Sequence, residues 1–126
     1  MIEVELVSFN RCNIDEHDID AGQLEFLEFF GRADEIQCFQ DMKGFGETIC
    51  EFLQIDYKSD WEHEGMNVEW DYFILTKERA LDLVKKLSTV SLKYMECRGF
   101  VIDILNKIIK DFDFEEEILA ITVGEQ

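Results

Sequence analysis

The chain has 126 residues, of which 29 are Asp or Glu and 12 are Lys or Arg, so its formal net charge at pH 7 is -17. This length predicts one domain, and a hydrophobic content of 47% excludes a disordered chain in spite of the charge. The first residues lack the pattern of a signal peptide, and no run approaches the roughly 18 apolar residues of a membrane helix. We therefore expect a cytoplasmic protein that does not enter the membrane.

The first residues alternate in polarity and predict a half-buried strand over residues 2–9, with Ile2, Val4 and Leu6 on one face and Glu3, Glu5 and Val7 on the other. A polar loop follows and contains the acidic stretch NIDEHDID at residues 13–20. Asp20 is a candidate N-cap, because Gln23 follows it at the spacing of a capping box. The apolar run 22–31 then predicts a short helix with Gly31 as its C′ residue.

The middle of the chain predicts shorter elements. Residues 34–40 alternate weakly and favour a short strand. Gly46 is expected to open a short helix that runs to about Gln54. Residues 55–66 are polar, contain turn-forming residues and predict a loop. The clearest strand follows at residues 67–75, where one face carries Val68, Trp70, Tyr72 and Ile74.

The last third of the chain predicts two helices and a strand. Thr76 is a natural N-cap for a helix over residues 77–90, with an apolar stripe of Ala80, Leu81, Val84 and Leu87. After a break near residues 88–91, the helical period returns over residues 92–112. Gly99 lies inside this second helix, where we expect it to permit close packing against a neighbour. The apolar run 115–123 predicts a terminal strand.

This order of elements predicts an α+β fold. We expect a single-domain sandwich over residues 1–126, with a mostly antiparallel sheet and the two longer C-terminal helices packed on one face.

The charge lies in separate segments of the chain. Residues 1–71 carry 19 acids and four bases, and residues 111–126 carry six acids and no base. Between them, residues 72–110 carry eight bases and four acids. So uneven a distribution either keeps the protein soluble or forms a surface for a basic partner, since complementary charge speeds association.

No catalytic or metal-binding pattern emerges from the titratable residues. Residues 13–20 place Asp15, Glu16, Asp18 and Asp20 around His17, but neither register of an EF-hand loop fits them. The stretch is therefore expected to be a solvated loop that binds no ion. The cysteines form no C-x-x-C pair, and neither Cys12 with His17 nor Cys50 with His63 matches a known nucleophile motif. We expect no cofactor.

Aromatic residues alternate with acids between residues 60 and 72. Aromatic anchors beside acids suit a partner rich in Arg and Lys. Trp70 and Tyr72 are more often core residues in such a strand, whereas Trp61 is expected in the preceding loop. The candidate partner-binding residues are therefore Asp60, Trp61, Glu62, Glu64, Glu69 and Asp71, together with Asp15, Glu16 and Asp18 of the first acidic stretch.

These features favour a binding protein over an enzyme. The first hypothesis is an inhibitor that neutralises a basic partner, as an immunity protein neutralises a nuclease toxin or a nucleic-acid mimic occupies a nucleic-acid-binding enzyme. It implies no direct binding of nucleic acid or membrane. The alternatives are an acidic structural or adaptor subunit of a larger complex and, less favoured, a small hydrolase that uses Asp and Glu.

Overall fold

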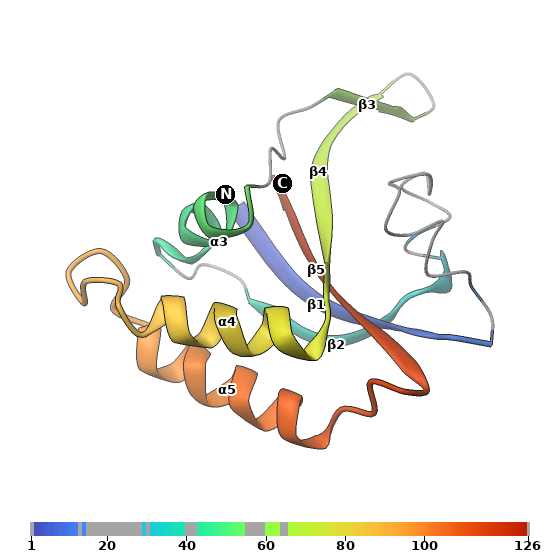
Figure 1. Cartoon of the computed structure of the whole chain (residues 1–126). Coiled ribbons are helices and arrows are strands. Elements are labelled where there is room, and N and C mark those ends of the chain that lie inside the picture. Colours follow the sequence, from blue (N-terminus) through green and yellow to red (C-terminus); the bar gives the residue numbers. More distant parts are fainter. Residues whose placement is uncertain are drawn as a thin grey trace.

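The computed structural model describes residues 2–12, 14, 29, 31–39, 43–54, 60–63 and 66–125, with backbone alone for residues 60–63, 66–69 and 125. The elements run in chain order (Figure 1) as β1 (Ile2–Asn10), β2 (Asp34–Phe39), α3 (Phe45–Leu53), β3 (Asp60–His63), β4 (Met66–Leu75), α4 (Lys77–Leu87), α5 (Arg98–Asp111) and β5 (Glu117–Glu125). The α+β class predicted from the sequence is confirmed.

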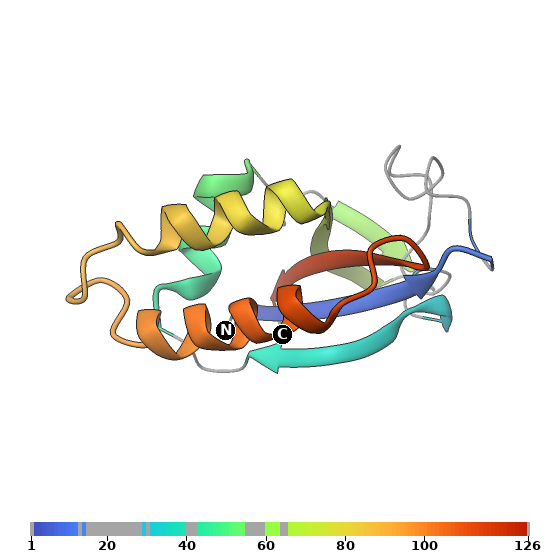
Figure 2. The same ribbon diagram turned by 60° about the horizontal axis from the view of Figure 1, so that its bottom comes forward.

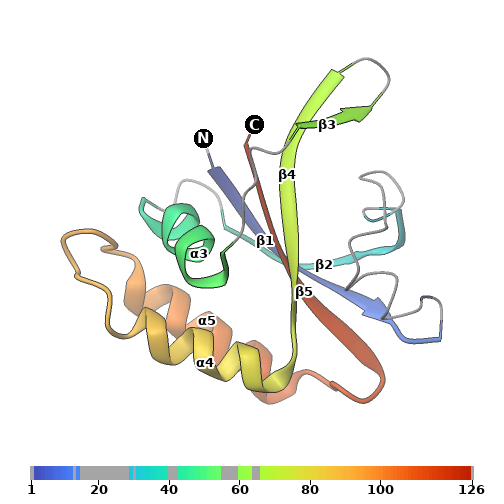
Figure 3. The same cartoon turned by 45° about the horizontal axis from the view of Figure 1, so that its top comes forward.

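The sheet is antiparallel throughout. Strands β2, β1, β5 and β4 lie side by side in that order, and β3 joins the outer side of β4. Residues 70–75 of β4 pair with β5, whereas residues 66–69 pair with β3. The β3–β4 hairpin therefore projects past the end of β5 (Figure 3).

The hairpin corrects one prediction. Residues 55–66 were expected to form a loop, but residues 60–63 form β3, in which Trp61 pairs with Val68. The error arose because acids and a histidine alternate with Trp61, so polarity concealed a strand. Residues 55–59, 64 and 65 lie outside the described residues.

The N-terminal strand is buried more fully than its pattern predicted. Val4 and Leu6 are buried on one face, but Val7 and Phe9 are also buried on the other. The strand is half-buried only around Glu3 and Glu5. Both faces of its second half are covered, because Leu6 packs in a cluster with the helices while Val7 and Phe9 pack in a second cluster that includes Phe29.

A first hydrophobic cluster joins one face of the sheet to helices α3, α4 and α5, and we call this the helix-covered face (Figure 2). It contains Val4, Leu6, Leu119, Ile121 and Val123 from the sheet, Ile49 from α3, Ala80, Leu83 and Leu87 from α4, and Val101, Leu105 and Ile109 from α5. A second cluster lies on the opposite face, which we call the outer face. It contains Val7, Phe9, Ile14, Phe29, Trp70, Ile74, Ile118 and Ala120.

Helix α4 begins as predicted. The Thr76 side chain accepts a hydrogen bond from the backbone N–H of Arg79, which satisfies a donor at the free helix end. The predicted apolar stripe was wrong at one position, because Leu81 is 49% exposed and Leu83 is buried instead. Positions 80, 83, 84 and 87 follow the helical period, and Leu81 lies about 100° away from Ala80.

Helix α5 begins later than predicted. Residues 92–97 form turns, and the helix starts at Arg98, whose side chain donates to the backbone carbonyl of Val90. The close packing expected at Gly99 is absent, because a Cβ there would meet nothing within 4 Å. Close packing occurs instead at Gly44, the N-cap of α3, which has a φ of +82°. A Cβ at Gly44 would collide with the carbonyl oxygen of Tyr94.

The segment before β2 is described only in part. Phe29, Gly31 and Arg32 are helical, so Gly31 is not the C′ residue that the sequence predicted. The proposed N-cap at Asp20 and the acidic stretch from Asp15 to Asp20 lie outside the described residues.

Candidate binding surface

Three glutamates lie together on the outer face of the sheet. Glu3 and Glu5 alternate with core residues along β1, so their side chains leave the strand on the face turned away from the helices. Glu35 reaches the same face from β2, where it pairs with Val7. We call Glu3, Glu5 and Glu35 the glutamate cluster.

An irregularity in β2 brings Glu35 to this face. Leu6 pairs with Gln37 while the next residue, Val7, pairs with Glu35, so Ile36 is an extra residue of the kind that forms a β-bulge. Ile36 packs against the helix-covered core. In a regular ladder Ile36 would pair with Val7 and Glu35 with Ser8, so Glu35 would point to the helix-covered face, since a shift of one residue reverses the face of a side chain.

Glu5 lies at the centre of the glutamate cluster. Partial burial raises the pKa of its carboxyl from 4.5 to about 7, with further contributions from a hydrogen bond to Glu35 and from the negative charges of Glu35 and Glu3. With a pKa near 7, Glu5 is protonated about half of the time at neutral pH. A cation placed here would favour the charged form and release the proton.

The Cys38 thiol lies beside the glutamate cluster, opposite Glu5 in the β1–β2 pairing. Its Sγ donates a hydrogen bond of 3.2 Å to Oε1 of Glu3. Burial raises the pKa of this thiol to about 12, and the hydrogen bond and the surrounding carboxylates act in the same direction. The thiol is therefore protonated at neutral pH and is a poor nucleophile.

The same residues come close enough to hold a metal ion. One ligand atom each from Glu3, Glu5 and Cys38 lies within 4.8 Å of the others. A metal would have to displace the thiol proton, because the thiolate is the form that binds. The arrangement therefore favours an ammonium or guanidinium group over a metal ion, because such a group needs only the carboxylates.

Aromatic residues flank the glutamate cluster across a strip of small residues. On β5, Thr122 lies between Glu5 and Tyr72, and Gly124 lies between Glu3 and Trp70. The Trp70 and Tyr72 rings stack with centroids 5.3 Å apart. The Phe29 ring lies 4.6 Å from that of Tyr72 and 5.1 Å from that of Trp70.

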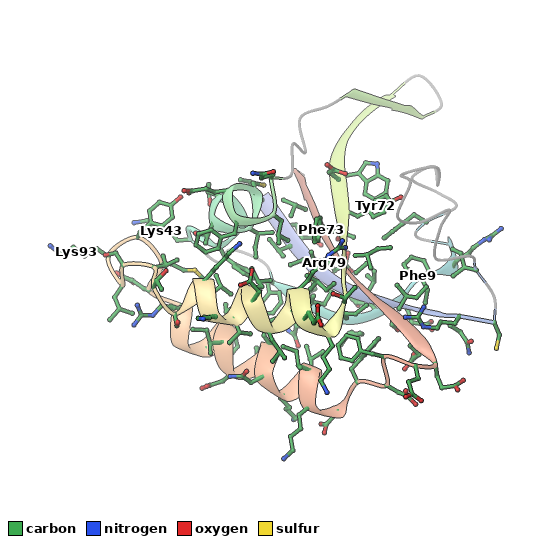
Figure 4. All side chains as sticks on the ribbon, viewed as in Figure 1. Phe9, Lys43, Tyr72, Phe73, Arg79 and Lys93 are labelled. Carbon is green, nitrogen blue, oxygen red and sulfur yellow. The ribbon has the colours of Figure 1, made fainter. Side chains whose placement is uncertain are left out.

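This packing confirms that Trp70 is a core residue, since it is 3% exposed. Tyr72 is half-buried. Figure 4 shows Tyr72 and Phe9 on the side away from α4, and Phe73 beside Arg79 near that helix. The Arg79 guanidinium lies 5.0 Å from the centre of the Phe73 ring.

The structure describes only some of the residues that were predicted to bind a partner. Asp71 is half-buried, and its side chain accepts a hydrogen bond from the backbone N–H of Tyr72. The β3–β4 hairpin contains Asp60, Trp61, Glu62 and Glu69, for which the structure describes the backbone alone. Asp15, Glu16, Asp18 and Glu64 are outside it altogether.

Sequence reasoning missed the glutamate cluster. Glu3 and Glu5 were assigned to one face of a strand but treated as ordinary solvent-facing residues. The alternation of Glu3 and Glu5 was a usable signal, whereas the approach of Glu35 depends on the irregular pairing at Ile36.

No family model, curated protein or solved structure matches this chain. Within the part of the chain that the structure describes, no helix combines the length and the hydropathy needed to cross a bilayer.

Proposed function

We propose that this chain is an acidic binding protein that neutralises a basic protein partner. The partner would be a nuclease toxin or a nucleic-acid-binding enzyme, and the chain would act as an immunity-type protein or a nucleic-acid mimic. The observation that carries the proposal is the glutamate cluster, in which Glu3, Glu5 and Glu35 approach one another on the outer face.

Mutual repulsion in this cluster supports binding of a cation. Like charges at a shared site destabilise the charged forms, and a Lys or Arg between them removes that repulsion. Binding therefore gains the attraction to the new cation and also the relief of the repulsion already present. A surface that only solubilised the chain would gain from spreading its carboxylates apart.

The distribution of charge along the chain supports a directed interaction. The segment that contains α4 and α5 carries more bases than acids, while the segment that contains β1, β2 and β3 carries the largest acidic excess. Electrostatic steering by charge distributed so unevenly would orient a basic partner toward the acidic segments.

A reducing compartment suits the proposal. Cys12, Cys38, Cys50 and Cys97 are all free thiols. Free cysteines are usual in cytoplasmic proteins, so we propose that the chain meets its partner in the cytoplasm.

The test is affinity capture from the source cell followed by kinetics with the purified partner. The captured protein is expected to be basic, and its association rate should fall as the salt concentration rises. The Debye length shortens from about 10 Å at 0.1 M to about 3 Å at 1 M. A triple variant Glu3→Gln, Glu5→Gln and Glu35→Gln should associate more slowly, with a weaker salt dependence.

The matched control removes the same charge elsewhere. Glu47 and Glu51 of α3 and Glu78 of α4 are exposed, and their change to Gln makes the net charge less negative by the same amount. If both triple variants reduce the association rate equally, only the overall charge matters and the glutamate cluster is not the site. A partner that associates at a rate independent of salt would contradict the electrostatic mechanism itself.

A further inference from the structure

Strand β2 lies at one edge of the sheet beside a groove. In the described part of the chain, β2 pairs with β1 alone. An edge strand presents backbone N–H and C=O groups that can pair with another chain. Next to it lies a cavity of about 420 Å³ between β2 and α5, lined by the apolar residues Ile36, Ile104, Ile108 and Phe112 and by the polar residues Ser8, Gln37, Lys107, Asp111 and Glu117.

Helix α5 presents apolar residues beside its fully buried stripe. Its core stripe is Val101, Leu105 and Ile109, all buried. A second stripe, formed by Phe100, Ile104 and Ile108, precedes each core residue by one position. Ile104 and Ile108 are half-buried and line the groove, and Phe100 is 56% exposed. Ile104 and Ile108 also pack against the helix-covered core, so these two residues border both that core and the groove beside the β2 edge.

The two sides of the β2 edge differ in chemistry. Ile36 and Gln37 line the groove on the helix-covered face. Glu35 lies on the outer face beside Glu5. A strand added at this edge would place alternate side chains on the two faces, because side chains alternate along a strand. One set would contact Ile36, Ile104 and Ile108 in the groove, and the other would lie next to the glutamate cluster.

We propose that the β2 edge binds an extended segment of the basic partner as an additional strand. Apolar side chains of that segment fill the groove against Ile104 and Ile108, and Lys or Arg side chains alternate with them and face Glu35 and Glu5. This rests on the proposed function, to which it adds the mode of binding and the pattern of the recognised segment.

Charge favours a basic segment over a second copy of the chain at the β2 edge. Asp34 and Glu35 begin β2, so pairing of β2 with itself would add acids to an acidic edge. Two copies that each carry a net charge of -17 would also repel each other. A basic strand meets neither penalty.

The first probe is a synthetic peptide of about ten residues that alternates lysine and valine, measured by fluorescence anisotropy at about 0.1 M salt. The control peptide has the same composition with all its lysines in one block. Strand addition predicts that the alternating peptide binds at least about tenfold more tightly. Equal affinity would overturn the proposed strand, because a response to charge alone does not depend on the order of residues.

Backbone pairing is tested with two N-methylated forms of the alternating peptide. One carries methyl groups on every lysine amide and the other on every valine amide, so each blocks one edge of the peptide strand. Because only one edge pairs with β2, one form should lose about tenfold or more in affinity and the other should keep most of it. Equal effects of the two forms would also overturn the strand.

The protein variant is Glu35→Lys, with Glu47→Lys on α3 as a control of equal charge change. The introduced lysine would lie beside Glu5, so the fold should be retained, and a thermal melt checks this. We expect Glu35→Lys to lower the affinity for the alternating peptide by about tenfold and the control variant to lower it by much less. Equal weakening by both variants would count against the β2 edge. The proposed function would still stand if the natural partner bound with strong salt dependence, and it would fail separately if that dependence were absent.

Discussion

The two faces of the sheet place their carboxylates in opposite surroundings. On the helix-covered side, Asp82 of α4 forms an ion pair of 3.2 Å with Lys86 one turn later. On the outer face, Glu5 has carboxylates as neighbours and a raised pKa. The ion pair compensates the charge of Asp82, whereas the charged form of Glu5 meets further carboxylates in the glutamate cluster. Such an arrangement lowers the stability of the folded protein when Glu5 is charged.

The largest expected effect comes from the packed part of the outer face. Phe29 is fully buried and contacts the rings of Phe9, Trp70 and Tyr72. We expect Phe29→Ala to lower the free energy of unfolding by about 3–5 kcal/mol, because it removes a buried ring and leaves a cavity. Chemical denaturation measures the change.

The control makes the same substitution at a solvent-exposed ring. Phe100→Ala on α5 should change stability by about 0.5 kcal/mol or less, since Phe100 is more than half exposed. A small loss of unfolding free energy in Phe29→Ala would mean that the outer face is not a second core. The contrast between its packed end and its charged end would then disappear.

The next effect concerns binding at the β3–β4 hairpin. Trp61 remains a predicted interface anchor, now placed in a strand rather than a loop. Trp61→Ala should weaken binding of the natural partner by about 2 kcal/mol or more and leave the stability of the fold nearly unchanged. A loss of about 3–5 kcal/mol in unfolding free energy would instead identify Trp61 as a core residue and restrict the binding surface to the glutamate cluster.

Sequence patterns predicted the elements more successfully than their contacts. β4 and the N-cap Thr76 were predicted because alternation and capping are local signals. Leu83 was missed because α4 offers several apolar residues, and the face that turns inward depends on what the helix packs against. The glutamate cluster was missed because strand pairing is not a local property, and the extra residue Ile36 changes the register by one.

The glutamate cluster should make stability depend on pH. The carboxyl of Glu5 has a pKa near 4.5 in the unfolded chain and about 7 in the folded protein. Between these values the folded protein holds more protons, so its stability is highest at low pH and falls as pH rises. We expect this group to account for a loss of about 1 kcal/mol between about pH 5 and pH 8, a value reduced for solvent screening of a half-exposed side chain.

Glu5→Gln isolates this contribution. Urea denaturation of the variant should show a stability gain at about pH 8 and a smaller fall between about pH 5 and pH 8 than the parent protein. Glu78→Gln, an exposed change on α4, provides the control. A parent protein that became more stable as pH rose, with the same slope in Glu5→Gln, would show that neither burial nor neighbouring carboxylates disfavour the charged form of Glu5 in the folded protein.

The smallest effect tests the compensated side of the comparison. Asp82 and Lys86 are four residues apart on α4, with about half of each side chain exposed. Pairs of this kind stabilise a helix by about 0.3–0.5 kcal/mol, because solvent screens the attraction. Asp82→Asn should therefore lower stability by about that amount at low salt and by less in about 1 M salt. The opposite sign is expected for Glu5→Gln at about pH 8, where loss of the carboxylate removes the cost of burying a charge and the repulsion from Glu35 and Glu3, instead of an attraction. A double-mutant cycle with Lys86→Ala measures the pair directly. If Asp82→Asn and Glu5→Gln shifted stability in the same direction, the two faces would not differ in how they balance charge, and the electrostatic basis for a partner at the outer face would be lost.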